Sequence, residues 1–294
     1  MRLTRPGKLL FPDDGITKGD LVEYYRSTAP RILPYLRDRP MVMGRYPEGI
    51  GGEAILQKNV PGYFPSWITR AAVKKQGGTN SQVVCDKPAT LVYLANQACI
   101  ELHMFLSRLD ALQEPDQLVF DLDPPDAGHF GVARRTALSL RGLLEEELGL
   151  AAFVKTTGGK GLHVHVPLRP AEDFDAVREF ARQVAELLAS RDPGELTTTQ
   201  RKGERGDRLY LDMMRNAYAQ TAVAPFSVRA RPGAHVATPL HWEELEDGSL
   251  NPGQFTIRTI EARLAKVSDP WAGMTRRRRG LAEPRRRLRT LSAG

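Results

Sequence analysis

Residues 118–125 read LVFDLDPP, and this stretch decides the fold because its apolar and acidic residues alternate. Successive side chains of a β-strand point to opposite faces, so the three apolar residues at 118, 120 and 122 are expected to face a core. Asp121 and Asp123 then share the other face. The pattern predicts a strand with one buried face and two parallel carboxylates near its end.

Helices and strands alternate on the C-terminal side of this stretch. Apolar spacing predicts, in order, strand 118–122, helix 132–148, strands 153–155 and 162–166, helix 174–188 and strand 209–213. Such an alternation indicates a small sheet with helices packed on it, as in α/β or α+β proteins. We place this core at about residues 115–235.

The N-terminal part contains helical and irregular segments. Thr17 and Asp20 resemble a capping box that opens a helix, which Pro30 and Pro34 interrupt. Short strands are expected at 41–43 and 54–56, and the apolar spacing of residues 91–106 predicts a buried helix.

The composition is that of a folded globular protein. The chain has 294 residues, 41% of them hydrophobic, and no apolar N-terminal segment or membrane-length apolar run. Cys85 and Cys99 lie in no Cys-x-x-Cys pair, so both are expected to be reduced and structural. We therefore expect a cytoplasmic location and no membrane contact.

The net charge of +7 is concentrated near the C-terminus. Residues 276–289 contain eight Arg and one Glu, and the rest of the chain has as many acidic as basic residues. Runs of like charge are usually solvated, so we expect residues 271–294 to form a disordered basic tail after a domain at 1–270. Weak, salt-sensitive phosphate binding is the alternative role for this tail.

Three carboxylates are candidates for metal binding. The parallel pair Asp121 and Asp123 would repel each other unless a cation lay between them. Asp212 lies in the apolar segment RLYLDMM, where a buried carboxylate needs a cationic partner. Oxygen ligands favour Mg²⁺ or Mn²⁺, and two such ions could support phosphoryl transfer. Solvated acids in an Asp-Pro turn, or a structural salt bridge at Asp212, are the alternatives.

The segment TTGGKG at 156–161 lies between two of the predicted strands. Its glycines allow backbone N–H groups to approach oxyanions, and Thr157 and Lys160 add a hydroxyl and a charge. The segment therefore predicts a triphosphate site, with a plain hairpin turn as the alternative. His163 and His165 share one face of the next strand, so one of them could face the site.

Four ordered segments, VFDLDP, TTGGKGLHVHVPL, RLYLDMMRN and TAVAPFSVRAR, resemble the polymerase domain of bacterial DNA ligase D, a branch of the archaeo-eukaryotic primase superfamily. The resemblance runs from GKLLFPDDG near the start to DPWAGM before the basic tail. It implies an α+β fold, in which an RRM-like catalytic core is joined to an N-terminal α/β subdomain.

The resemblance also implies a function. Family members extend 3′ ends at DNA gaps, overhangs and breaks, often prefer ribonucleotides and Mn²⁺, and work with the bacterial end-binding protein Ku in non-homologous end joining. Asp121, Asp123 and Asp212 match the metal ligands of two ions. For the incoming NTP or dNTP we expect His103, Thr157, Gly159, Lys160, His163 and Arg229, and for DNA Lys8 and Lys18 at the 5′ phosphate, Lys58 and Arg205.

The chain departs from the family pattern in two respects. Ile55-Leu56 stands where family members often have paired aromatic residues that stack on the template, and Tyr63, Phe64 or Trp67 are possible substitutes. No Lys-x-Asp-Gly adenylation motif is present, so a stand-alone polymerase that needs a separate ligase is expected. A noncatalytic DNA-end or single-strand binding module and a metal-dependent phosphodiesterase are the competing functions.

Overall fold

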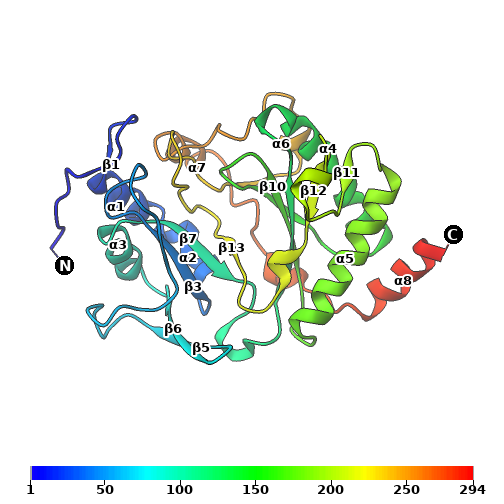
Figure 1. Cartoon of the computed structure of the whole chain (residues 1–294), viewed down its shortest axis with the longest axis horizontal. Helices are drawn as coiled ribbons and strands as arrows, with labels where there is room; N and C mark the ends of the chain where they lie inside the picture. Colours follow the sequence, from blue (N-terminus) through cyan, green and yellow to red (C-terminus); the bar gives the residue numbers. More distant parts are fainter. Residues whose placement is uncertain (1, 294) are drawn as a thin grey trace. The chain divides into compact units, whose positions relative to one another are not determined.

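The computed structural model describes residues 2–293, which form two compact units that interleave along the chain. The first unit consists of the segments up to Asp110, Thr221–Thr238 and Gly253–Val267. The second consists of Ala111–Gln220, Pro239–Pro252 and the segment from Ser268 onward. Both units combine helices with a sheet, as Figure 1 shows, in agreement with the predicted α+β class.

The second unit is built on a six-stranded sheet in the order β11-β12-β8-β10-β9-β14. The central strand β8 pairs antiparallel with both β10 and β12. The strands are β8 (Gln117–Asp123), β9 (Phe153–Thr156), β10 (Leu162–Pro167), β11 (Leu196–Thr197), β12 (Leu209–Asp212) and β14 (Pro239–Leu240). Every strand predicted between residues 118 and 213 is therefore present.

Helices cover this sheet with their apolar sides. Helix α4 (Phe130–Gly142) continues into a π-helical turn (Leu143–Glu147), and α5 (Phe174–Arg191) is capped by Asp173. Both helices contact β8, whose Leu118, Phe120 and Leu122 are fully buried. The short helix α6 (Glu243–Glu246) contacts α4. The full burial of one strand face and the partial exposure of Asp121 and Asp123 on the other follow the alternation in the sequence.

The first unit contains a second six-stranded sheet in the order β13-β7-β3-β6-β5, with β4 paired to β3. Thr17 caps the first helix with a complete capping box, as predicted. The strands of this six-stranded sheet are β3 (Pro40–Arg45), β4 (Ile55–Gln57), β5 (Arg70–Lys75), β6 (Gly78–Val84), β7 (Cys99–Phe105) and β13 (Thr221–Val223). A separate two-stranded sheet consists of β1 (Leu9–Phe11) and β2 (Ile16–Thr17). The helices are α1 (Lys18–Ser27), α2 (Ala29–Leu36), α3 (Pro88–Asn96) and α7 (Ile260–Leu264). Cys85 and Cys99 are buried and not joined by a disulfide.

Two predictions about this part of the chain are wrong. Residues 91–106 form the end of α3 and strand β7 rather than one helix, and the break falls at Ala98, whose φ is +56°. Residues 100–104 of β7 do alternate, with Glu101 and His103 partly exposed between buried apolar residues, so a strand pattern was present but was read as helical spacing. The predicted core at 115–235 also extends too far, since Thr221–Thr238 belongs to the first unit through the pairing of β13 with β7.

The predicted disordered tail is also wrong for the described residues. Ala282–Ala293 forms helix α8, which contacts α5, and Leu281 and Leu288 are buried. Two of the arginines act as anchors: Arg278 binds Asp116 at 2.6 Å and Arg285 binds Glu172 at 2.5 Å. Charge alone predicted a solvated run, but two buried leucines and two acidic partners order the segment.

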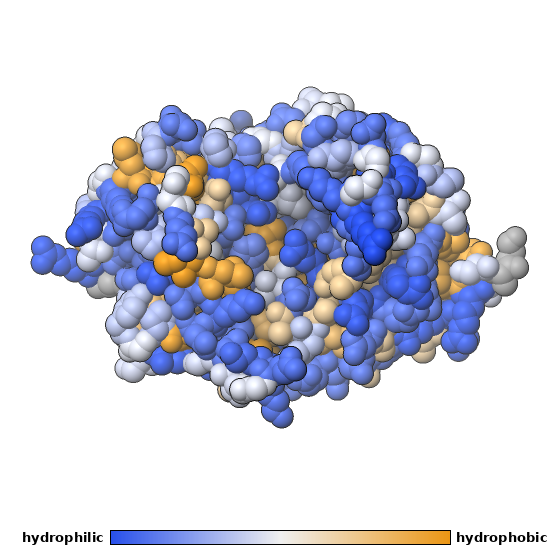
Figure 2. Space-filling model, in the orientation of Figure 1, coloured by the Kyte–Doolittle hydropathy of each residue, from blue (hydrophilic) through white to orange (hydrophobic). Residues whose placement is uncertain are grey.

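No helix within residues 2–293 is both long and apolar enough to cross a bilayer. Figure 2 shows a face that is mostly hydrophilic, with apolar residues scattered over it.

Candidate active site

Three neighbouring strands of the second unit place Asp212, Asp121 and His163 in one row. Asp212 of β12 pairs with Asp121 of β8, which pairs on its other side with His163 of β10. Directly opposed residues of antiparallel strands project to the same face, with their Cβ atoms about 5 Å apart. Asp123 lies two residues beyond Asp121 and shares this face. The sheet therefore gathers all three predicted carboxylates.

Asp121 is largely buried, with 13% of its side chain exposed, and is flanked by two basic groups. His163 Nε2 lies 3.5 Å from its Oδ1, and Arg215 Nε lies 3.4 Å from its Oδ2. Burial alone would raise the pKa of Asp121, but His163 and Arg215 outweigh it and hold the pKa below its ordinary value. Asp121 is therefore a carboxylate at neutral pH.

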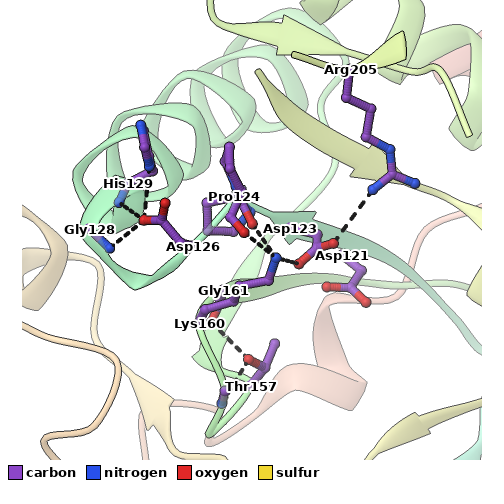
Figure 3. A network of polar contacts seen from close by, with 12 residues as sticks. Asp121, Asp123, Pro124, Asp126, Gly128, His129, Thr157, Lys160, Gly161 and Arg205 are labelled. Atoms are coloured by element: carbon purple, nitrogen blue, oxygen red, sulfur yellow. Dashed lines mark hydrogen bonds and ion pairs between the residues drawn. The ribbon is translucent and has the colours of Figure 1, made fainter. Parts of the chain in front are cut away.

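Asp123 binds the loop that was predicted to hold a triphosphate, as Figure 3 shows. Lys160 Nζ lies 3.1 Å from Asp123 Oδ1 and donates to the carbonyl oxygens of Pro124 and Pro125. On the other side, Arg205 Nη1 lies 3.7 Å from Asp123 Oδ2. Two side chains predicted to bind nucleotide and DNA thus converge on one candidate metal ligand.

Asp212 lacks such compensation. Its Oδ1 accepts a hydrogen bond from the Met214 N–H at 2.7 Å, and no basic side chain within residues 2–293 lies within 4.0 Å of its carboxylate. Burial raises the pKa of Asp212, and the negative charge of Asp121 raises it further. The alternative of a structural salt bridge at Asp212 therefore finds no support in the described part of the chain.

The donor set fits a hard divalent cation. Within the described residues no three His, Cys, Asp or Glu side chains are gathered closely enough to bind one ion. Asp121 and Asp123 are paired with Arg215 and Lys160 instead. The three carboxylates offer only oxygen ligands, which Mg²⁺ and Mn²⁺ prefer. A cation would relieve the repulsion between Asp121 and the uncompensated Asp212. Asp121, Asp123 and Asp212 are the residues that would hold it.

The segment 156–161 is a tight hairpin loop between β9 and β10. The Thr157 N–H and hydroxyl both donate to the Gly161 carbonyl at 3.1 Å, and the Gly159 N–H donates to Thr157 Oγ1. Gly158 has a φ of +64°, which glycine adopts without strain. The loop thus has the geometry of the alternative, a hairpin turn, and it also presents Lys160 to the carboxylates.

The two histidines of β10 have different surroundings. His163 faces Asp121, and burial together with the nearby charge of Lys155 lowers its pKa to about 4, so its imidazole is neutral at pH 7. His165 is fully buried, bonds Gln117 Oε1 through Nδ1 at 3.0 Å and packs on Trp271. His163 is therefore the histidine at the site, and His165 belongs to the core.

The first unit holds a separate polar cluster around Glu101 of β7. Arg229 Nε donates to Glu101 Oε1 at 2.8 Å, and His103 Nε2 lies 3.3 Å from Oε2. Burial opposes ionisation of Glu101, but His103 and Arg229 outweigh it and lower its pKa. Two of the predicted nucleotide-binding residues, His103 and Arg229, are thus fixed by one carboxylate.

We expect Glu101→Gln to lower the free energy of unfolding at pH 7 by about 1.5–3 kcal/mol, the usual contribution of charged hydrogen bonds. A depressed pKa stabilises the fold above the unfolded value of about 4.3, and that stability is lost as the pH falls below it. Urea unfolding between pH 7 and 3 should therefore show a flatter acid limb for the variant. Glu48→Gln, which breaks the exposed pair with Lys8, is the control and should leave stability nearly unchanged, because solvent screens exposed ion pairs. Equal effects of the two variants would contradict this account of Glu101.

The predicted DNA-binding lysines also lie in the first unit. Lys18 is buried, and its Nζ donates to Thr4 Oγ1 at 3.0 Å. Burial lowers the pKa of Lys18, and the positive charges of Arg5 and Lys8 lower it further. Lys8 pairs with Glu48 at 2.7 Å, and Lys58 is exposed after β4. The structure thus brings Lys8 and Lys18 together, whereas Lys58 lies in a different segment, directly after β4.

The loop that departs from the family pattern is exposed. Ile55 and Leu56 of β4 are 43% and 61% exposed, Tyr63 is 61% and Trp67 is 41% exposed, and Phe64 is buried. Of the three possible aromatic substitutes, Phe64 is therefore a core residue and the other two are accessible.

Sequence reasoning missed several residues at the carboxylates. Arg215 contacts Asp121, and the buried amide of Asn216 bonds both the N–H and the carbonyl of Val119 on β8. Lys155 is fully buried and pairs with His163 across β9 and β10. No sequence signal marks Asn216 or Lys155, whereas Arg215 follows Asp212 by three residues and could have been grouped with the other arginines.

Comparisons with known proteins identify the family of this chain. Residues 17–271 match the family described as LigD, primase-polymerase domain. The chain is 32% identical over 272 residues to the bifunctional non-homologous end joining protein LigD of Bacillus subtilis, covering 92% of this chain and 43% of that protein. It is 34% identical over 257 residues to the multifunctional LigD of Mycolicibacterium smegmatis, covering 87% of this chain and 34% of that one.

A solved structure, the polymerase domain from Mycobacterium tuberculosis ligase D in complex with DNA, aligns with a TM-score of 0.89 at 31% sequence identity. The alignment covers 94% of this chain and 98% of that one. The chain thus spans less than half the length of the two LigD relatives and nearly all of the polymerase-domain structure. Because the family model covers residues 17–271 and the fold aligns with a solved polymerase domain, the chain belongs to the LigD primase-polymerase domain family.

Proposed function

We propose that this chain is a metal-dependent nucleotidyltransferase that extends 3′ ends at DNA gaps, overhangs and breaks. The observation that carries the proposal is the row of Asp212 and Asp121, with Asp123 beside it, next to the basic loop that presents Lys160. Family membership and the likeness to a DNA-bound polymerase domain support it. The domain corresponds to about residues 1–270.

The reaction forms a bond between the primer 3′ oxygen and the α-phosphorus of a nucleoside triphosphate, and the bond to the β-phosphate breaks to release pyrophosphate. Two bound Mg²⁺ or Mn²⁺ ions would activate the 3′ hydroxyl and neutralise the leaving pyrophosphate. Lys160 carries the charge that suits the triphosphate, and Thr157 and Gly159 shape its loop. The neutral imidazole of His163 orients Asp121 without adding positive charge.

The proposal extends to partners and pathway. Lys8 and Lys18, with Arg5 beside them, supply a local positive charge suited to the 5′ phosphate across a gap. Tyr63 and Trp67 are the accessible aromatic side chains that can stack on a base in place of the family's aromatic pair. We assign the chain to bacterial non-homologous end joining in the nucleoid, with Ku and a DNA ligase as partners and ribonucleotides as preferred substrates.

A primer-extension assay tests the proposal. A labelled primer on a gapped duplex, with or without a 5′ phosphate at the far side of the gap, is incubated with Mn²⁺ or Mg²⁺ and either rNTPs or dNTPs. We expect templated lengthening that is faster with rNTPs and with the 5′ phosphate. A shortened primer would indicate a phosphodiesterase instead. DNA binding without any change in primer length would indicate a noncatalytic end-binding module.

A further inference from the structure

Five of the eight arginines of the C-terminal segment fall into two groups with different surroundings. Arg278 and Arg285 bind the acidic side chains Asp116 and Glu172 and hold the segment in place. Arg276, Arg277 and Arg279 are exposed, and none has an acidic partner within 4.0 Å among the described residues. Arg278 and Arg285 thus anchor the segment, whereas the positive charges of Arg276, Arg277 and Arg279 are not balanced by a nearby acidic side chain among the residues that the structure describes.

The uncompensated arginines line two adjoining cavities of the second unit. One, of about 190 Å³, is lined by Arg276, Arg277 and Arg279 around the turn at Gly149. The other, of about 460 Å³, shares Arg279 and Gly149 and adds Arg287 from α8. The guanidinium of Arg287 covers the turn, since a Cβ built on Gly149 would lie 3.2 Å from its Nη1. The turn thus forms a concave floor with arginines on its sides.

The acidic residues that line these cavities are already paired. Glu145 binds Arg141 at 3.0 Å, and Glu283 binds Arg287 at 3.0 Å. The walls therefore carry an excess of positive charge in a concave surface, which favours an anion.

The backbone of this segment is fixed on both sides of the arginines. The buried Trp271 donates through Nε1 to the Val154 carbonyl at 2.9 Å. After the arginines, Arg279 forms a β-bridge with Leu168, and the Arg169 N–H donates to its carbonyl at 2.9 Å. Because the backbone is ordered before binding, less conformational entropy is lost when a ligand is bound.

This cluster lies at the opposite end of the sheet from the carboxylates. Arg279 bridges Leu168 just beyond β10, whereas His163 near the start of β10 pairs with Asp121. Five residues of extended chain separate these points, or roughly 17 Å at about 3.3 Å per residue. A ligand group at the arginines is therefore distinct from the reacting atoms.

We propose that Arg276, Arg277, Arg279 and Arg287 form a second phosphate-binding surface that holds the backbone of the nucleic acid outside the active site. Arginine binds phosphate oxygens bidentately, and closely spaced arginines suit the repeated phosphates of a strand. None of the exposed large hydrophobic side chains of the described residues lies in this segment, so it lacks the apolar groups that insert into membranes. DNA as the ligand rests on the proposed function.

The test measures how the Kd for a fluorescent duplex depends on salt, without metal or nucleotide, for wild type and Arg276→Gln/Arg277→Gln/Arg279→Gln. For every phosphate that the variant no longer binds, the slope of log Kd against log salt should fall by about 0.9. The control, Arg182→Gln/Arg191→Gln/Arg289→Gln, removes the same charge from exposed positions on α5 and α8 and should keep the wild-type slope.

Wild-type slopes in both variants, or equal reductions in both, would overturn the proposal. So would a triple variant that binds DNA normally but no longer binds phosphatidylserine vesicles, since the partner would then be a lipid surface. Primer extension by the wild type is scored separately. If the wild type extends primers and the triple arginine variant keeps the wild-type salt slope, only this inference is contradicted. If the triple variant has a reduced slope but the wild type never extends a primer, only the polymerase assignment is contradicted.

Discussion

Asp121→Asn/Asp123→Asn is expected to abolish primer extension, with a fall of about a thousandfold or more. Removal of a single preorganised electrostatic contact in an active site commonly costs about 10²–10³ in rate, and this variant removes two of the three carboxylates that would hold the metal ions. Asparagine keeps the shape of each side chain, so loss of charge is the main change. The measurement is single-turnover extension on a gapped duplex with Mn²⁺.

The matched control is Asp175→Asn on the exposed side of α5, which breaks only a surface pair with Arg178 and should extend primers normally. Thermal unfolding followed by circular dichroism checks that the double variant is folded. A folded double variant that retained more than a tenth of wild-type extension would place the metal site elsewhere.

Gly161→Ala is expected to impair both folding and extension. A Cβ at Gly161 would lie 2.1 Å from the Leu122 carbonyl oxygen, which belongs to the strand that carries the carboxylates. Since a backbone atom cannot give way as a flexible side chain can, β8 and β10 must separate, and we expect a loss of roughly 3 kcal/mol in the free energy of unfolding. A displacement of about 1 Å at a reacting group can cost about a hundredfold in rate.

Gly142→Ala in α4 is its control, because a Cβ there meets nothing within 4 Å and alanine favours a helix. In urea unfolding, Gly161→Ala should be less stable than wild type and Gly142→Ala more stable. Primer extension is measured for both variants. If Gly161→Ala were as stable and as active as wild type, the close approach of the loop to Leu122 would not constrain the site.

The fold of the second unit could be predicted because its strands and helices carry local signals. Apolar and acidic residues alternate in β8, and α5 has an N-terminal cap and an apolar stripe. Each element can therefore be predicted from its own residues. Strand β7 was mistaken for a helix although residues 100–104 alternate, because the break at Ala98 has no glycine or proline to separate it from α3. The order in α8 was missed because it depends on contacts with Asp116 and Glu172, which lie far away in the sequence.

The candidate site could be predicted only in part from the sequence. Alternation placed Asp121 and Asp123 on one face, but the pairing of Asp212 with Asp121 depends on strand register, which the sequence does not contain. For the same reason the contact of Asn216 with β8 could not be predicted, whereas Arg215 could have been grouped with the other arginines near Asp212. The family resemblance supplied residue roles that geometry leaves as proposals, including those of His103 and Arg229.

The interleaving of the two units has a consequence for biosynthesis. The first unit uses segments as far along the chain as Val267, and the second begins at Ala111 and is completed only after Ser268. Neither unit is one continuous stretch of chain. The N-terminal unit therefore cannot complete its fold while the rest of the chain is still being translated, as N-terminal domains usually do. At about 5–20 residues per second, strand β7 waits for its partner β13 for roughly 6 to 25 seconds after leaving the peptidyl transferase centre. Nascent chains therefore expose an unpaired edge of the first sheet during translation, and chaperone demand should be greatest in that interval.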